Sequence, residues 1–301
     1  MATTQEPFEH VAILGLGLMG ASLGMALRAA GVARVVTGYD AGPGVTERAR
    51  ERGAIDLACA HVSEAVAEAD LIVLAAPIRT VPDLFTAIAP SLTSSSLITD
   101  LCSVKAYLVS CAERILPDPG HFVGGHPMTG SERSGVEAAR ADLYNGCVWP
   151  LTPTERTGPE AIARLSWMIG RLGATPLLLN AAEHDAAVAL ISHLPRIAAS
   201  GLVLAAAQSA SWPVARELAA GGFQGTTRVA SGDPAMMLDI CDANTAALFT
   251  SLDAYIETLV ALRARIANKD TTLEDTFSSA KQTRDDWLRA RGHSSHSEPD
   301  A

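Results

Sequence analysis

A glycine-rich loop near the N-terminus constrains the fold more than any other feature of the chain. It directly follows an apolar run and opens an amphipathic stretch that predicts a helix over residues 18–30. In a strand–loop–helix unit, glycines at this spacing give a tight turn, let the backbone approach a pyrophosphate and let the helix pack closely. The segment therefore predicts a dinucleotide-binding unit. The residues expected to contact the cofactor are Gly15, Gly17, Leu18, Met19 and Gly20.

An acidic residue indicates which dinucleotide binds. Asp40 ends the second predicted strand, where a carboxylate accepts hydrogen bonds from ribose hydroxyls and repels a 2′-phosphate. We therefore expect NAD rather than NADP. Ala76 and Pro77 end the third predicted strand, where they would meet the cofactor. An ordinary strand ended by proline explains these two residues equally well.

The first 180 residues alternate short apolar runs with amphipathic stretches. This alternation is typical of a parallel sheet with helices on both faces. We therefore predict an α/β, Rossmann-type dinucleotide-binding domain over residues 1–180. Its strands are expected at residues 10–14, 34–39, 71–75, 97–100, 122–125, 148–152 and 175–179.

From residue 181 the pattern changes to long helical stretches rich in Ala and Leu. They cover residues 183–209, 213–220 and 234–268 and predict an all-helical domain over residues 181–277. The first stretch is apolar on most faces, so it must be enclosed by its own domain or by a second copy of the chain. We expect a homodimer through this domain, and a loosely ordered polar tail over residues 278–301.

Charge and cysteine content exclude several classes of protein. The chain has 23 Lys and Arg against 33 Asp and Glu, a formal charge of −10, so nucleic acid is not an expected partner. An anionic ligand would need a few Arg and His side chains gathered in a cleft. The five cysteines form no CxxC pair, which argues against a disulfide framework or a metal site and favours a cytoplasmic protein.

Neither a signal peptide nor a membrane span is expected. The first nine residues are polar and lack the basic start of a signal peptide. The longest apolar stretch, residues 186–207, carries His193, Pro195 and Arg196 in its middle, which fits a bilayer core poorly. We interpret it as a buried helix of a protein without a membrane partner.

Two histidines stand where chemistry can be expected. His126 follows the predicted strand at residues 122–125, so it should reach the same crevice as the glycine loop and act there as a base. His193 and Arg196 lie three residues apart and share a helix face, with Pro195 between them expected to kink the helix. For each histidine the alternative is a structural residue with satisfied hydrogen bonds.

Five motifs together resemble the prephenate and arogenate dehydrogenases of tyrosine biosynthesis, over roughly residues 8–275. The resemblance implies a Rossmann domain followed by a helical dimerisation domain. It also implies oxidative decarboxylation of prephenate to 4-hydroxyphenylpyruvate with reduction of NAD. The motifs are GLGLMGASL at the glycine loop, DLCSVK at 100–105, GGHPMTGSERSG at 124–135, SHLPR at 192–196 and RVASGDPAMMLDI at 228–240.

The resemblance implies two candidate catalytic residues. His126 would take the proton of the substrate hydroxyl while a hydride leaves the same ring carbon. Ser103 would hydrogen-bond the imidazole or the hydroxyl. Ser103 can equally be the N-cap of a helix predicted over residues 104–115, and the two roles are compatible.

It also implies a set of substrate-binding residues. Arg228 would pair with a carboxylate of prephenate, since a guanidinium binds carboxylates bidentately. Glu132 would pair with a cation at the mouth of the site and gate entry, although a surface carboxylate is an equal alternative. His193 and Arg196 would complete the substrate pocket.

The chain departs from the family pattern at two positions. Many relatives carry a second His where Arg196 stands, and Trp where Met237 stands. A permanent cation at 196 would favour the anionic tail of prephenate over the zwitterionic side chain of arogenate, or would simply reshape the pocket.

Three alternatives stay open: an arogenate dehydrogenase, another dehydrogenase of the β-hydroxyacid type, and a non-catalytic NAD-binding regulator. The β-hydroxyacid enzymes usually rely on a catalytic Lys in the helical domain. This chain has no Lys between residues 181 and 268, which argues against that class.

Overall fold

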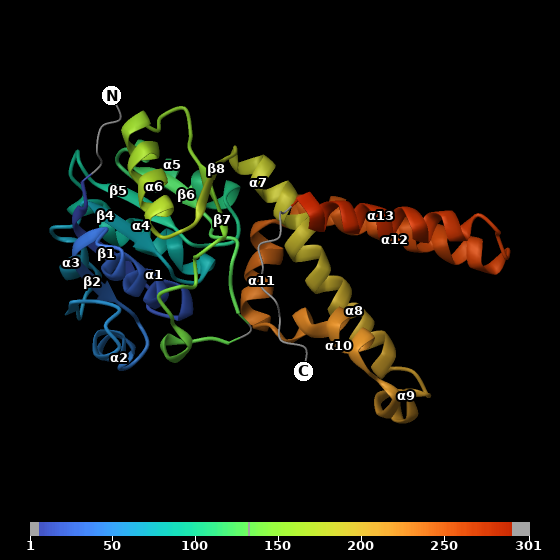
Figure 1. Ribbon diagram of the computed structural model, residues 1–301. Coiled ribbons are helices and arrows are strands. Elements are labelled where there is room, and N and C mark those ends of the chain that lie inside the picture. Colours follow the sequence, from blue (N-terminus) through green and yellow to red (C-terminus); the bar gives the residue numbers. More distant parts are fainter. Residues whose placement is uncertain (1–5, 132, 291–301) are drawn as a thin grey trace. The chain divides into compact units, whose positions relative to one another are not determined.

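The computed structural model describes residues 6–131 and 133–290. Within them, eight strands form one sheet in the order β3-β2-β1-β4-β5-β6-β7-β8. Neighbours pair in parallel except β6 and β7, which are antiparallel (Figure 1). The strands are β1 Phe8–Leu14, β2 Ala33–Tyr39, β3 Leu57–Ala58, β4 Leu71–Leu74, β5 Leu97–Asp100, β6 Phe122–Gly125, β7 Val148–Thr152 and β8 Thr175–Leu178.

The predicted α/β fold is confirmed, and each of the seven expected strands is present to within two residues at either end. The strand missed by the sequence, β3, has only two residues, which is too short to produce an alternating pattern. The topology places the carboxyl ends of β1, β4 and β5 side by side at the centre of the sheet, where parallel α/β sheets bind ligands.

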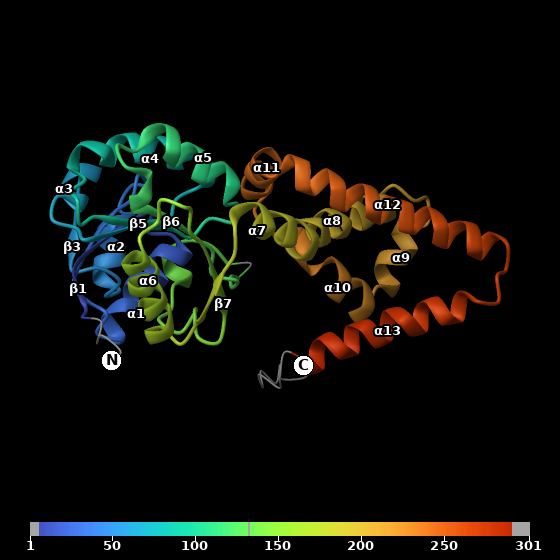
Figure 2. The same cartoon turned by 90° about the horizontal axis from the view of Figure 1, so that it is seen from above.

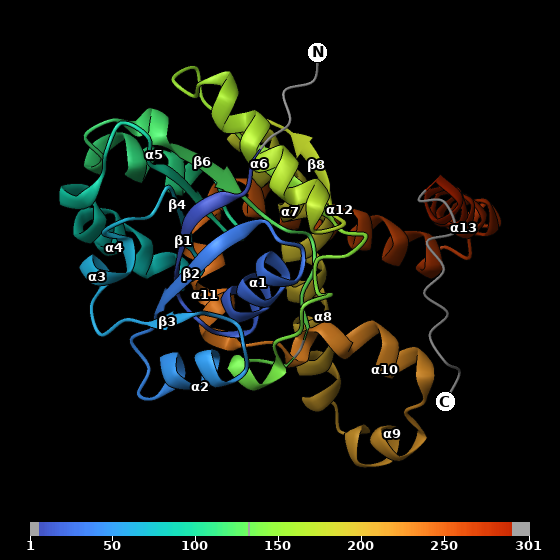
Figure 3. The same cartoon turned by 60° about the vertical axis from the view of Figure 1, so that its left-hand side comes forward.

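Helices cover both faces of the sheet. Side chains alternate along β1, so Val11 and Ile13 join one apolar core and Ala12 and Leu14 join the other. The first core packs against α1, α2 and α6 and the second against α3, α4 and α5. Figures 2 and 3 show these helices around the sheet. These helices are α1 Leu18–Ala29, α2 Val45–Glu51, α3 Val62–Val66, α4 Val81–Ile88, α5 Ala106–Ile115 and α6 Pro159–Arg171.

The helical part is more interrupted than the sequence predicts. The stretch expected at residues 183–209 is a helix, a π-helical turn and a second helix, and the stretch at 234–268 breaks at Asn244. Pro195 lies two residues after the π-turn and has no N–H to continue the hydrogen-bond ladder, which explains the change at that point. The segments are α7 Ala181–Val188, the π-turn Ala189–His193, α8 Leu194–Ala207, α9 Trp212–Leu218, α10 Gly221–Thr227, the short 3₁₀ segment Arg228–Ser231, α11 Pro234–Ala243, α12 Thr245–Ala267 and α13 Leu273–Ala290.

The prediction of a loosely ordered tail is wrong for residues 278–290, because these residues belong to α13. The segment is polar, but ion pairs between residues three and four apart support a helix. Lys281 pairs with Asp285 and Arg289 pairs with Asp286. The rest of the expected tail, residues 291–301, lies outside the described residues.

The chain divides into two compact units, Met1–Leu248 and Phe249–Ala301. The first helices of the expected helical domain thus belong to the same unit as the sheet. Polar contacts from α7 and from α11 are among those that tie them to it. Asp185 on α7 accepts hydrogen bonds from the backbone N–H groups at the start of α5, and Asp239 on α11 pairs with Arg79 after β4.

Two helical stretches, Ala181–Ala207 and Thr245–Ala267, are long and apolar enough to cross a membrane by length and composition alone. The first is interrupted by the π-turn, and His193, Pro195 and Arg196 lie at its middle. These features are costly in a bilayer.

Candidate active site

The three glycines of the loop after β1 are needed for three different reasons. Gly15 has a φ of +103°, a conformation that side chains rarely adopt. A Cβ at Gly20 would lie 1.9 Å from the Gly15 carbonyl oxygen, so α1 can approach the loop only with glycine there. Gly17 has open space where its Cβ would stand, and it lines the central cavity. This is the free approach that a pyrophosphate at the N-terminus of α1 requires.

Asp40 is fixed at the end of β2 by two backbone hydrogen bonds. One carboxylate oxygen accepts from Leu16 N–H at 2.7 Å, and the other accepts from Gly42 N–H at 2.7 Å. A carboxylate has further lone pairs, so Asp40 can still accept hydrogen bonds from a ribose. The loop and this carboxylate together fit a dinucleotide.

A cavity of about 400 Å³ lies beside the loop. It brings together residues that the sequence predicts for cofactor binding and for chemistry. Gly17, Leu18 and Met19 line it from the glycine loop, Ala76 and Pro77 from the end of β4, and Ser103 and His126 from the ends of β5 and β6. Residues of α11 and the loop before it, Asp233, Ala235, Met236, Asp239 and Ile240, close it from another side.

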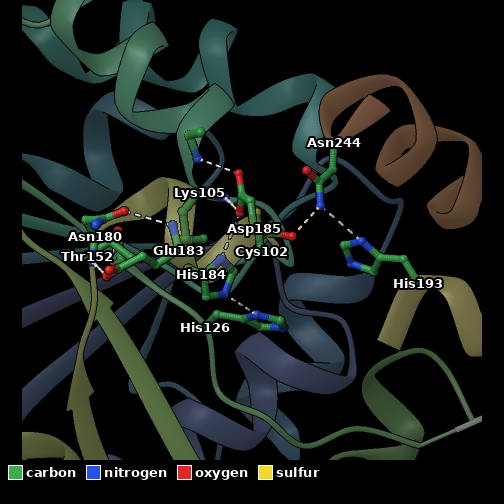
Figure 4. Close-up of polar contacts among 12 residues, drawn as sticks. Cys102, Lys105, His126, Thr152, Asn180, Glu183, His184, Asp185, His193 and Asn244 are labelled. Carbon is green, nitrogen blue, oxygen red and sulfur yellow. Dashed lines mark hydrogen bonds and ion pairs between the residues drawn. The ribbon is translucent and has the colours of Figure 1, made fainter. Parts of the chain in front are cut away.

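His126 is held in this cavity by backbone and side-chain contacts. Its N–H donates to the Pro150 carbonyl across the antiparallel β6–β7 pair at 3.0 Å, and only 8% of the residue is exposed. Its Nδ1 lies 2.9 Å from Nε2 of His184 on α7. Nδ1 of His184 lies in turn 2.8 Å from Oδ1 of Asp185 (Figure 4).

Asp185 is anchored to the start of α5. Its two carboxylate oxygens accept from the N–H groups of Lys105 and Ala106, each at 2.8 Å. The expectation that Ser103 caps this helix is wrong, because α5 begins at Ala106 and the capping carboxylate comes from α7. Ser103 and His126 both line the cavity. Among the described residues, the structure has no hydrogen bond between these two side chains.

A buried ion pair lies next to His126. Lys105 and Asp100 are both 0% exposed, and the ammonium group contacts the carboxylate directly. Lys105 Nζ also donates to the Gly125 carbonyl at 2.7 Å, and Gly125 N–H donates to Asp100 at 3.0 Å. The pair therefore fixes the backbone immediately before His126.

These surroundings keep the imidazole of His126 neutral. Burial, followed by the positive charge of Lys105 and by the neighbouring His184 and His193, lowers the pKa of His126 well below its ordinary value of 6.5. A neutral imidazole carries one unprotonated nitrogen, so it can accept a proton at neutral pH.

His193 ends the π-turn and is 1% exposed. Burial lowers its pKa from 6.5 to about 4, against the opposing effect of Asp185. Its Nδ1 lies 3.3 Å from Nδ2 of Asn244, which also donates to the Asp185 carbonyl at 2.9 Å. Since the amide nitrogen is a donor, Nδ1 of His193 accepts and its proton is on Nε2. That Nε2 is buried and has no partner among the described residues.

His193, Arg196 and Arg228, which the sequence predicts to bind substrate, are not among the residues that line the cavity. Arg196 on α8 donates to the Asp233 carbonyl at 2.7 Å, beside the cavity. Arg228 is exposed on the 3₁₀ segment that packs against α8, and it is not among the residues that line the cavity. Arg79 and Arg133 do line it. Glu132 lies outside the described residues.

Sequence reasoning missed His184, Asp185, Asn244 and the pair of Asp100 and Lys105. Asp100 and Lys105 belong to the DLCSVK motif, in which the resemblance implies a role for the serine alone. The available signal for His184 and Asp185 is a run of three polar residues, 183–185, at the start of a mostly apolar helical stretch.

Known proteins resemble the chain over nearly its whole length. The prephenate dehydrogenase nucleotide-binding domain matches residues 23–177, and the prephenate dehydrogenase dimerization domain matches residues 180–279. A cyclohexadienyl dehydrogenase of Zymomonas mobilis is 36% identical over 87% of this chain and 90% of its own.

Two solved structures share the fold. An arogenate dehydrogenase of Synechocystis has a TM-score of 0.81 and 32% identity, covering 92% of this chain and 99% of its own. A prephenate dehydrogenase of A. aeolicus, in complex with hydroxyphenyl propionate and NAD⁺, has a TM-score of 0.87 and 29% identity, covering 95% and 99%. With its Rossmann-type domain, its cavity histidine and these matches, the chain belongs to the prephenate dehydrogenase family.

Proposed function

We propose that this protein oxidises and decarboxylates prephenate to 4-hydroxyphenylpyruvate with NAD as the hydride acceptor. The observation that carries the proposal is that neutral His126 lines the same cavity as the glycine loop and Ser103. The relatives act on prephenate, arogenate or cyclohexadienyl substrates by name, so the choice of prephenate rests on this chain's own residues.

The residues of the glycine loop fit NAD as the cofactor. When bound, NAD accepts the hydride from the ring carbon that bears the hydroxyl. Gly17 leaves room for the pyrophosphate, and Asp40 accepts from the ribose and repels a 2′-phosphate. Ala76 and Pro77 line the cavity where the nicotinamide end would lie.

His126 acts as the general base. Its unprotonated nitrogen takes the hydroxyl proton as that oxygen becomes a carbonyl. Loss of carbon dioxide from the opposite ring carbon then makes the ring aromatic and leaves a phenolate oxygen. The protonated imidazole returns the proton to this oxygen, so the reaction releases no net proton. Ser103, at the same cavity, hydrogen-bonds the hydroxyl as its charge changes.

Cationic and donor groups bind the two carboxylates of prephenate. His193 offers a buried Nε2–H with no partner among the described residues, and an N–H donor suits a carboxylate or keto oxygen. Arg196 supplies a permanent positive charge beside the cavity, which favours the anionic tail of prephenate over an ammonium-bearing one. Arg228 and Glu132 keep the roles that the resemblance implies, as carboxylate partner and gate.

The protein acts as a homodimer through its helical domain, residues 181–277, in the cytoplasm. The match to the family's dimerization domain supports this assembly. So do the apolar side chains of the helical part that are exposed in a single chain, among them Ile191 and Leu204 near and on α8.

Initial rates of NADH formation test the proposal. Purified protein is offered prephenate or arogenate, each with NAD and with NADP. We expect kcat/KM to be highest for prephenate with NAD. A preference for arogenate would contradict the role of Arg196, and a preference for NADP would contradict that of Asp40. In the same assay Arg228→Ala should raise KM for prephenate with little change in kcat.

A further inference from the structure

We propose that His184 and Asp185 are positioning residues that fix the proton of His126 on Nδ1 and thereby leave Nε2 as the base facing the cavity. The inference rests on the proposed function, because it assigns the base of that reaction to one nitrogen atom. It concerns three side chains from two elements, the end of β6 and the first turns of α7.

Asp185 serves as an acceptor in three contacts. Its oxygens receive the N–H groups of Lys105 and Ala106, and Oδ1 also contacts Nδ1 of His184 at 2.8 Å. Since both oxygens already accept backbone N–H groups, Asp185 faces His184 as an acceptor. An ionised carboxylate cannot donate, so Nδ1 of His184 carries the proton.

The orientation of His184 then determines that of His126. Neutral His184 protonated on Nδ1 has a lone pair on Nε2, and this atom lies 2.9 Å from Nδ1 of His126. A bond between these two nitrogens needs one proton, so Nδ1 of His126 donates it. The lone pair of His126 is consequently on Nε2, the nitrogen that His184 leaves to the cavity.

The same chain of hydrogen bonds supports the charged state that the reaction creates. When Nε2 takes a proton, the bond from Nδ1 to His184 becomes charge-assisted and therefore stronger. His184 is in turn bonded to the negative charge of Asp185. This offsets the repulsion from Lys105, whose own charge is paired with Asp100. His193, from the π-turn, is the remaining titratable group that acts on His126.

A role in packing alone would not require this arrangement. Asp185 caps α5 whichever tautomer His184 adopts, and buried His184, 1% exposed, fills space in either form. A structural role predicts effects on the melting temperature. A positioning role predicts a specific protonated nitrogen on His126 and a loss confined to kcat.

The experiment measures the tautomer directly. Imidazole ¹⁵N spectra of ¹⁵N-histidine-labelled, full-length protein without substrate are recorded at neutral pH, and the His126 signals are assigned by comparison with His126→Asn. We expect the proton on Nδ1. A proton on Nε2 in the wild-type protein would overturn the inference, and this readout needs no variant at 184 or 185 and no activity.

Variants add the kinetic test. His184→Gln keeps an oxygen that can accept from Nδ1, so kcat should stay within about tenfold of wild type, while His184→Phe removes the acceptor and should lower kcat by about 100-fold. Asp185→Asn can present an amide N–H to His184 and reverse the tautomers of His184 and His126. We expect this variant to lower kcat by about 100-fold or more. KM for prephenate should change by less than about threefold in each. His61→Phe, at an exposed histidine, is the control.

Two results separate this inference from the proposed function. Full kcat in His184→Phe, with wild-type turnover of prephenate, would overturn the positioning role and leave the function standing. Absence of prephenate turnover in the wild type, with the proton of His126 on Nδ1, would contradict the function and leave the positioning intact.

Discussion

At the scale of single residues, two buried histidines take opposite hydrogen-bonding roles, and of the two only His126 is among the residues that line the cavity. His126 donates through Nδ1 and leaves Nε2 to accept, whereas His193 accepts at Nδ1 and leaves Nε2 to donate. One suits a proton acceptor and the other an anion-binding donor. Both are neutral because burial lowers their pKa values.

The lowered pKa values predict a dependence of stability on pH. The pKa of His193 is about 4 in the folded chain and 6.5 ordinarily, so between these values the unfolded chain binds a proton that the folded chain does not. The free energy of unfolding is therefore unaffected by this histidine above pH 6.5. As the pH drops toward 4, it falls by on the order of 2–3 kcal/mol. His126 adds to the fall in the same direction.

Thermal melting between pH 7.5 and 4 measures this dependence. The melting temperature of the wild type should fall steadily below pH 6.5, and His193→Asn should reduce the slope. A wild-type melting temperature that stays constant down to pH 4, or an unchanged slope in the variant, would show that His193 is not held neutral.

Sequence could predict His126 and not its partners, for a physical reason. His126 follows a strand within a motif, so its position is determined locally. His184 lies 58 residues away and Asn244 lies 51 residues from His193. Which polar side chains meet across such distances depends on the packing of α7 and α11, which no local pattern encodes.

At the scale of elements, the strand–loop–helix unit of β1 and α1 allows a matched pair of substitutions. Gly17 has a φ of −69° and open space for a Cβ, whereas a Cβ at Gly20 would collide with the Gly15 carbonyl. We expect Gly17→Ala to keep the melting temperature but raise KM for NAD at least about tenfold, because the methyl group occupies the pyrophosphate approach.

Gly20→Ala should behave in the opposite way. The collision forces the backbone to move and should lower the free energy of unfolding by about 1–3 kcal/mol. Thermal melting and NAD titration of both variants check the pair. A destabilised Gly17→Ala protein, or one with unchanged affinity for NAD, would contradict this account of the loop.

Elements were predictable where periodicity is strong and less so where a side chain interrupts it. The strands of the sheet are short, mostly apolar runs between turns, and the seven predicted ones agree with the structure to within two residues. The predicted helix over 234–268 breaks at Asn244, whose backbone leaves the helical region at φ −123° and ψ 31° and whose side-chain amide donates to the Asp185 carbonyl. The π-turn before Pro195 has no distinct sequence pattern either.

At the scale of the whole molecule, assembly should bury apolar helix surface. In the first unit Leu190, Ile191 and Leu204 are 58–64% exposed, and in the second unit Phe249 and Val260 are each 60% exposed. Large apolar side chains exposed along helices indicate an interaction surface, and the helical part matches a dimerization domain.

Light scattering coupled to gel filtration tests the assembly. We expect a mass of twice the 31.4 kDa of one chain, and Leu204→Lys should shift the protein toward monomer. The control variant Arg263→Lys, which introduces lysine at an exposed, polar position, should leave the mass unchanged. A monomeric wild type would contradict the proposed homodimer.

The central claim is that His126 is the base of a prephenate dehydrogenase, and product analysis tests it most directly. Wild type and His126→Asn are incubated with prephenate and NAD, and NADH and 4-hydroxyphenylpyruvate are both quantified. The wild type should form NADH and 4-hydroxyphenylpyruvate in equal amounts. In His126→Asn, kcat should be about 10²- to 10⁴-fold lower, with KM nearly unchanged. His121→Asn, whose imidazole contacts the Ser96 carbonyl outside the cavity, should match the wild type. Full kcat in His126→Asn, or NADH without 4-hydroxyphenylpyruvate in the wild type, would contradict the claim.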